Sequence, residues 1–122
     1  MIGQVPWMIG TIIVGISIGQ SAFIAHGLKK LEPDEEKQAK LRTALENARL
    51  ITMINGLGLA MIGLKNSRSA LVFLPSTLLL LGTILFPGII FYEAVTKNDV
   101  FHKFIKFGGM ASIFGYFAMA LI

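Results

Sequence analysis

The sequence has 122 residues, of which 54% are hydrophobic and only 15% are charged, and its formal net charge is +4. A soluble domain carries about 25% charged residues, so this composition excludes an ordinary water-soluble domain and indicates a membrane protein. The mean hydropathy of +0.70 agrees. The chain has no cysteine, which excludes disulfides, thiolate metal sites and cysteine nucleophiles.

The first apolar stretch runs from Met1 to Gly27, and its only ionisable side chain is His26. It is longer than the roughly 18 apolar residues that mark a membrane span. A secretory signal carries its basic residues before the apolar part, whereas Lys29 and Lys30 follow it here. We therefore expect the segment to be retained, and we predict a first span over residues 5–27.

The second predicted span covers residues 46–64, and its uncharged part is short. Arg49 can lie inside the helix if its aliphatic stem carries the charge to the headgroups. Upstream, Pro33 fits a first helical position and acidic residues follow it. We expect an amphipathic helix from here into the span, with Glu46 and Arg49 as an ion pair. This extension is either a docking surface for a partner or the solvated first turns of the helix that enters the membrane.

Two further spans are predicted over residues 70–94 and 104–122. The last is short, and Lys106 extends it in the same way as Arg49 extends the second. Pro87 lies within the third span, where its ring should kink the helix toward Gly88 and free the carbonyl of Thr83. The predicted fold class is thus an all-α membrane protein with four transmembrane helices in a small bundle.

The basic residues predict the orientation. By the positive-inside rule, the side with more lysine and arginine faces the cytoplasm or matrix, so both termini should face away from it. Two of the 11 basic residues, Lys65 and Arg68, fall on the side of the termini. The remaining nine fall on the other side: Lys29, Lys30, Lys37, Lys40, Arg42, Arg49, Lys97, Lys103 and Lys106.

Glycines are the main candidate packing residues. Gly15 and Gly19 recur at a spacing of four, which gives the first span a strip of small side chains, and such strips let helix backbones approach closely in lipid. We expect Gly56 in the second span, and Gly108 and Gly109 in the fourth, to pack against this strip.

Few polar side chains lie within the spans. Asn55 and Gln20 should form hydrogen bonds between helices, and Glu93 should pair with Lys97 four residues later. His26 could relay protons or bind metal only with a partner at the same depth. We favour an interfacial role, in which it donates to a carbonyl or contacts Glu46. For His102 we expect solvation only.

Three segments, SAFIAHGLKK, GTILFPGIIFYEAV and KFGGMASIFGY, match in order and spacing the pattern of the transmembrane protein 256 family, whose bacterial relatives are catalogued as a domain of unknown function. The resemblance covers essentially the whole chain. It implies a small four-helix membrane protein, associated in eukaryotes with mitochondria, and it supplies no established catalytic activity to transfer to this chain. The chain departs from the pattern in lacking a histidine in its second span, in having Pro87 where a small residue is usual, and in having Lys106-Phe107 before Gly-Gly.

The sequence offers no set of residues for nucleophilic catalysis, phosphate binding or metal coordination, so we expect neither an enzyme nor a cofactor, although a bound lipid is compatible with the pattern. The expected partners are membrane lipids and other membrane-protein subunits, and no nucleic acid. We expect an accessory subunit of a larger, respiratory-type complex of the mitochondrial inner membrane, with both termini on the intermembrane-space side. The alternatives are a bacterial plasma membrane as the location and, as the function, an independent small transporter or channel, alone or as a homo-oligomer.

Overall fold

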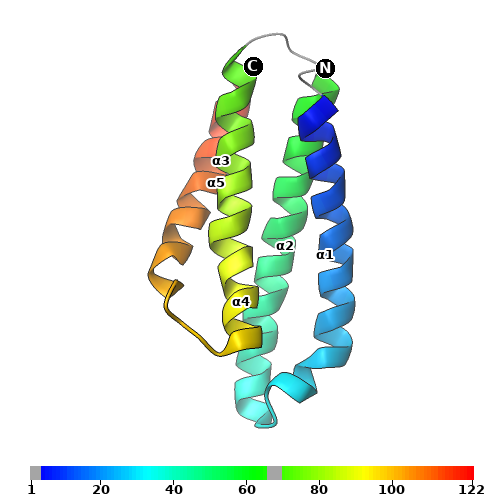
Figure 1. Ribbon diagram of the computed structural model, residues 1–122, viewed down its shortest axis with the longest axis vertical. Coiled ribbons are helices and arrows are strands. Elements are labelled where there is room, and N and C mark those ends of the chain that lie inside the picture. Colours follow the sequence, from blue (N-terminus) through cyan, green and yellow to red (C-terminus); the bar gives the residue numbers. More distant parts are fainter. Residues whose placement is uncertain (1–3, 66–69) are drawn as a thin grey trace.

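The computed structural model describes residues 4–65 and 70–122, so Arg68, which entered the charge count, lies outside the described residues. These described residues form four helical rods (Figure 1). The first is α1 (Gln4–Leu31) and the second is α2 (Glu35–Lys65). The third consists of the 3-10 turn η1 (Ala70–Val72), α3 (Phe73–Thr83), the π-helical turn η2 (Ile84–Gly88) and α4 (Ile89–Thr96). The fourth is the 3-10 turn η3 (His102–Phe104) followed by α5 (Ile105–Met119).

Successive rods run in opposite directions. The connection between α1 and α2 and the connection between α4 and α5 lie toward one end of the bundle, and both chain ends lie at the other (Figure 1). We call the first the basic end, because Lys29, Lys30, Lys37, Lys97 and Lys103 lie in or beside these two connections. Arg49, which was counted with them, lies near the middle of α2. The hairpin of α1 and α2 extends beyond the end of α4 at the basic end.

The start of α2 shows how the acidic segment before it works. The Asp34 carboxylate accepts the backbone N–H of Glu36 at 3.0 Å, and the Asp34 carbonyl accepts that of Gln38 at 2.8 Å. Asp34 is therefore the N-cap, and the helix begins at Glu35. The prediction that Pro33 occupies the first helical position is wrong, because the capping aspartate follows it.

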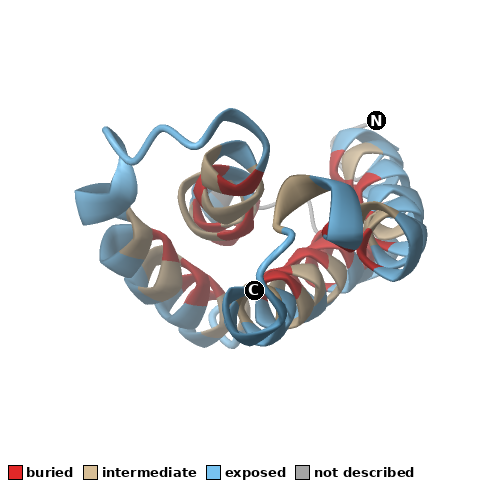
Figure 2. Cartoon of the chain, turned by 90° about the horizontal axis from the view of Figure 1, so that it is seen from below, coloured by how far each residue is buried: buried red, intermediate tan, exposed pale blue. Residues whose placement is uncertain are grey.

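Two hydrophobic clusters hold the rods together. Near the chain ends, Ile13 of α1, Leu59 of α2 and Leu79 of α3 belong to one cluster. Near the basic end, Leu28, Leu45 and Ala94 join α1, α2 and α4 in the other. Buried residues line the faces where helices meet, while the outer faces are exposed (Figure 2).

The exposed outer faces are strongly apolar, as expected of a surface that meets lipid. Ile18 is 69% exposed and Phe117 is 68% exposed. Within the described residues, α1, α2 and the continuous rod Phe73–Thr96 are long and apolar enough to cross a membrane. The 15 residues of α5 reach about 22 Å at 1.5 Å per residue, less than the roughly 30 Å hydrocarbon core. The predicted fold class, a small all-α membrane protein with an extended second helix, is confirmed.

Candidate functional site

A buried polar contact joins α2 and α5 within the bundle. Asn55 is 1% exposed, and its Nδ2 donates to the Ser112 hydroxyl at 2.9 Å. That hydroxyl donates in turn to the Gly108 carbonyl at 3.0 Å. The Asn55 Oδ1 has no hydrogen-bond partner among the described residues. The expected interhelical bond of Asn55 is therefore present, and its partner is a serine that the sequence reading had not selected.

A second contact lies one turn further along α5. The Tyr116 hydroxyl donates to the backbone carbonyl of Ile54, next to Asn55. Gly58 makes room for the ring, since a Cβ there would lie 2.6 Å from the Tyr116 hydroxyl oxygen. Two polar contacts thus fix the position of α5 along α2, which is how polar groups hold helices in lipid.

Glycines set the closest helix crossings. A Cβ at Gly10 would lie 2.5 Å from the Gly56 carbonyl oxygen, so α1 and α2 cross backbone to backbone. A Cβ at Gly108 would lie 2.5 Å from the Phe86 backbone nitrogen, so α5 crosses η2 equally closely. Gly109 is looser, with Phe86 ring carbons at 3.6 Å and beyond.

Gly15 and Gly19 do not pack inside the bundle. Both are exposed, and an added Cβ at either would meet no heavy atom of the described residues within 4 Å. The expectation that Gly56 and Gly108 pack against this strip is therefore corrected. The physical reason is that α1 turns Gly10, Ile13 and Ser17 toward its neighbours, and Gly15 falls on the opposite side of the helix.

A lateral cavity of about 390 Å³ opens between α1, α2 and the third rod. Its lining includes four residues with polar side chains: Gln20, Thr52, Thr83 and Tyr92. The two threonine hydroxyls donate to carbonyls of their own helices, each at 2.9 Å. The Gln20 Oε1 is buried and has no partner among the described residues, so the bond between helices expected of Gln20 does not form through this atom.

Pro87 lies beside this cavity and is buried. The helix accommodates it by widening into the π-helical turn Ile84–Gly88 and then continuing as α4. The sequence predicted a kink at this position, and the structure shows a single wide turn there. Turns of this kind are frequent at functional sites, which makes the cavity a candidate site.

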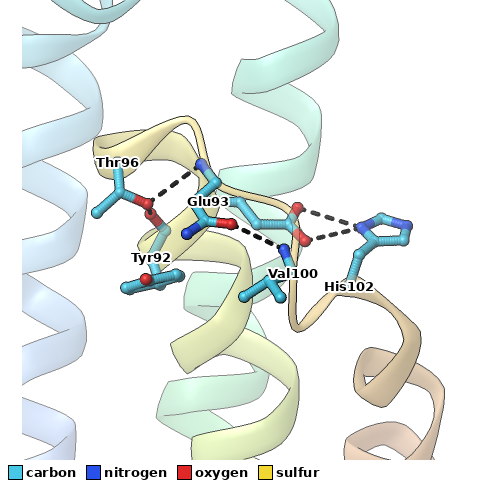
Figure 3. A network of polar contacts seen from close by, with 6 residues as sticks. Tyr92, Glu93, Thr96, Val100 and His102 are labelled. Atoms are coloured by element: carbon cyan, nitrogen blue, oxygen red, sulfur yellow. Dashed lines mark hydrogen bonds and ion pairs between the residues drawn. The ribbon is translucent and has the colours of Figure 1, made fainter.

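Glu93 and His102 form a network at the basic end. His102 Nδ1 lies 2.9 Å and 3.2 Å from the two carboxylate oxygens of Glu93, a contact that ties α4 to η3 (Figure 3). The intervening loop is held by short-range bonds, among them the one from the Val100 N–H to the Asn98 side chain at 3.0 Å. The expectation of solvation alone for His102 is therefore wrong.

Lys97 does not pair with Glu93, contrary to prediction. Its φ of 60° is left-handed and ends α4, so the side chain leaves the helix face that carries Glu93. The Lys97 ammonium instead donates to the Leu31 carbonyl at 2.7 Å and lies 3.9 Å from the Glu32 carboxylate. It links α4 to the connection between α1 and α2.

His26 is exposed on α1, and neither an ion pair nor a hydrogen bond involves it in the described part of the chain. The expected contact with Glu46 is absent, because Glu46 pairs with Arg49 at 3.2 Å as predicted. Residues 4–65 and 70–122 contain no group of three or more histidine, aspartate and glutamate side chains that could hold a metal ion.

The fold and these contacts define a small all-α membrane protein whose polar side chains join its helices. The chain belongs to the family described as protein of unknown function (DUF423), whose model matches residues 20–109. The resemblance to a family with bacterial relatives of this description is thereby confirmed.

Bacterial relatives match over nearly the whole chain. The UPF0382 membrane protein of Staphylococcus epidermidis is 27% identical over 115 residues, which cover 93% of this chain and 90% of the relative. The UPF0382 membrane protein of Staphylococcus haemolyticus is 29% identical with the same coverage of both chains. No solved structure matches.

Proposed function

We propose that this chain is a non-catalytic integral membrane protein that serves as a structural or accessory subunit of a larger membrane complex. The main support for this proposal is that the outer face of α1 is open and carries small residues. Gly15 and Gly19 leave this face open, since a Cβ at either would meet no heavy atom within 4 Å in the part of the chain that the structure describes. In lipid, an open strip of small residues lets another helix approach closely. Because α2 covers the opposite side of α1, that helix would come from another chain.

The polar contacts inside the bundle agree with a structural role. Hydrogen bonds of Asn55, Ser112 and Tyr116 connect α2 to α5. They give the bundle a rigid surface against which a helix of another chain can pack. As the location we propose a bacterial plasma membrane, with the basic end in the cytoplasm, because the relatives named above are staphylococcal membrane proteins. This location takes precedence over the mitochondrial inner membrane expected from the resemblance.

The test is the size of the native assembly. Membranes are solubilised in mild detergent and separated on a native gel, and the band that contains this chain is identified. We expect co-migration with a much larger complex, and release from it by Gly15→Leu, with no loss of thermal stability in the purified variant. Ala39→Leu, on the exposed surface of the α2 extension, is the control and should stay bound. A wild-type chain that migrates as a monomer or small homo-oligomer would refute the proposal.

The lateral cavity favours a second candidate function, a small transporter or channel. Broken or widened helices beside polar groups form the substrate sites of many transporters, and here η2 adjoins a cavity that contains Gln20, Thr52 and Thr83. This function predicts a homo-oligomer on the native gel. It also predicts solute flux in reconstituted vesicles, and Gln20→Leu should reduce that flux. An accessory subunit predicts neither result.

A further inference from the structure

A separate cleft of about 500 Å³ opens at the basic end, between the extension of α2 and the junction of α4 with α5. It is chemically divided. Its lining includes the cationic side chains of Lys37, Lys40 and Lys97 together with His102. Apolar side chains that include Leu41, Ile90 and Ile105 form the remainder of its wall.

The cleft has unneutralised positive charge. Its two acidic residues are already engaged, Glu93 with His102 at 2.9 Å and Glu32 with Lys97 at 3.9 Å. Lys37 and Lys40 are exposed and form neither an ion pair nor a hydrogen bond within the described segments. A ligand for this cleft should therefore carry negative charge next to an apolar part.

Neighbouring aromatic residues indicate that the cleft lies at the level of the lipid headgroups. Phe101, Phe104 and Phe107 form an exposed row whose successive ring centroids are 6.5 Å and 6.4 Å apart. The ammonium groups of Lys103 and Lys106 lie 5.3 Å and 5.4 Å from the centroids of two of these rings. Tyr92, a residue type enriched at the membrane interface, lies beside this row, with its ring centroid 5.6 Å from that of Phe101. The lysine side chains can extend their charges to the headgroups. His102, which lines the cleft, lies within this segment.

We propose that the cleft binds an anionic phospholipid. Lys37 and Lys40 contact the headgroup phosphate, and the apolar wall formed by Leu41, Ile90 and Ile105 receives the glycerol backbone and the first part of an acyl chain. Basic pockets between transmembrane helices bind acidic lipid headgroups in this way. The inference does not depend on the subunit role, since the cleft is formed by this chain alone.

The test compares lipid selectivity in bilayers. The purified protein is reconstituted in nanodiscs of phosphatidylglycerol and phosphatidylcholine, and spin-labelled phosphatidylglycerol reports the association constant relative to phosphatidylcholine. We expect a preference for phosphatidylglycerol in the wild-type protein. The double variant Lys37→Gln with Lys40→Gln should lower it by about fivefold for each lysine removed. The control double variant, Lys29→Gln with Lys30→Gln, removes the same charge at the same end but outside the cleft, and should change it little.

A second variant distinguishes specific lipid binding in the cleft from nonspecific electrostatic attraction to a charged surface. Ala44→Trp fills the cleft and keeps every lysine, so it should also reduce the preference, whereas Ala39→Trp on the same helix lies outside the lining and should not. Circular dichroism confirms that each variant is folded. Equal losses in the two lysine double variants, or an unchanged preference in Ala44→Trp, would overturn the proposal. So would a protein, instead of a lipid, that copurifies with the wild type and is lost in Ala44→Trp.

Discussion

Asn55 and Ser112 are 57 positions apart in the sequence, yet a side-chain hydrogen bond of 2.9 Å joins them across α2 and α5. The bond is buried, so neither water nor lipid headgroups can replace it. It connects the first helical pair to the second and, with the contact of Tyr116 on the Ile54 carbonyl, helps to fix how the two halves of the chain fit together.

The first prediction concerns the strength of this bond. In a double-mutant cycle, Asn55→Ala and Ser112→Ala should show a coupling free energy between about 0.6 kcal/mol, the average for hydrogen bonds between membrane helices, and about 1.7 kcal/mol, the maximum. Reversible unfolding in detergent or bicelles measures it. As a control, Asn55→Ala combined with Thr43→Ala, an exposed position on the same helix, should be additive. A coupling near zero for the first pair would mean that Ser112 is not the working partner of Asn55.

The second prediction contrasts two glycines of α1. Gly10→Ala places a Cβ 2.5 Å from the Gly56 carbonyl oxygen, and because backbone cannot move aside as a flexible side chain does, we expect a loss of about 1 to 3 kcal/mol in unfolding free energy. Gly15→Ala meets open space and should stabilise the helix by about 0.4 to 1 kcal/mol, because it lowers the entropy of the unfolded chain. Thermal unfolding of the purified variants gives both values. Variants that lose the same stability would show that the crossing is not at Gly10.

Local patterns predicted the helices and one of the two expected ion pairs within a helix; Glu46 pairs with Arg49, whereas Glu93 does not pair with Lys97. The extension of α2 and the pair Glu46–Arg49, at 3.2 Å, follow from spacing along one helix. The spacing of Gly15 and Gly19 resembled a packing strip, but it could not show which side of α1 meets α2. That depends on the sum of contacts around the helix, and the crossing at Gly10 with Gly56 decides it.

Contacts between distant segments were harder to predict. The partner of Asn55 could have been suspected, because Gly108, Ser112 and Gly115 recur at spacings of four and three and form a narrow small-residue face on α5. The partner of Glu93 gave no such signal. Its contact with His102 exists because the chain reverses after the left-handed residue Lys97, and no periodic pattern carries across such a reversal.

The third prediction concerns this reversal. Glu93→Gln removes the carboxylate that holds His102, so the loop between α4 and α5 should open more often. Since the His102 side chain is 70% exposed, the loss in global stability should stay below about 1 kcal/mol. Amide hydrogen exchange should speed up at His102, whose N–H donates to the Asp99 carbonyl at 3.0 Å. Glu35→Gln, in the first turn of α2, should leave this amide unchanged. An unaffected exchange rate in Glu93→Gln would rule out a tether.

The fourth prediction concerns topology, and the absence of cysteine from the sequence makes single-cysteine labelling clean. Lys30→Cys and Asn98→Cys lie at the basic end and should react with an impermeant maleimide from one side of the membrane. Lys65→Cys should react from the other side, because α1 and α2 run in opposite directions (Figure 1). Ile122→Cys decides the case of α5, which has only 15 residues. If Lys106 carries its charge to the headgroups, α5 crosses and Ile122→Cys reacts together with Lys65→Cys. Reaction together with Lys30→Cys would instead mean three spans, with α5 packed against the bundle without crossing the membrane.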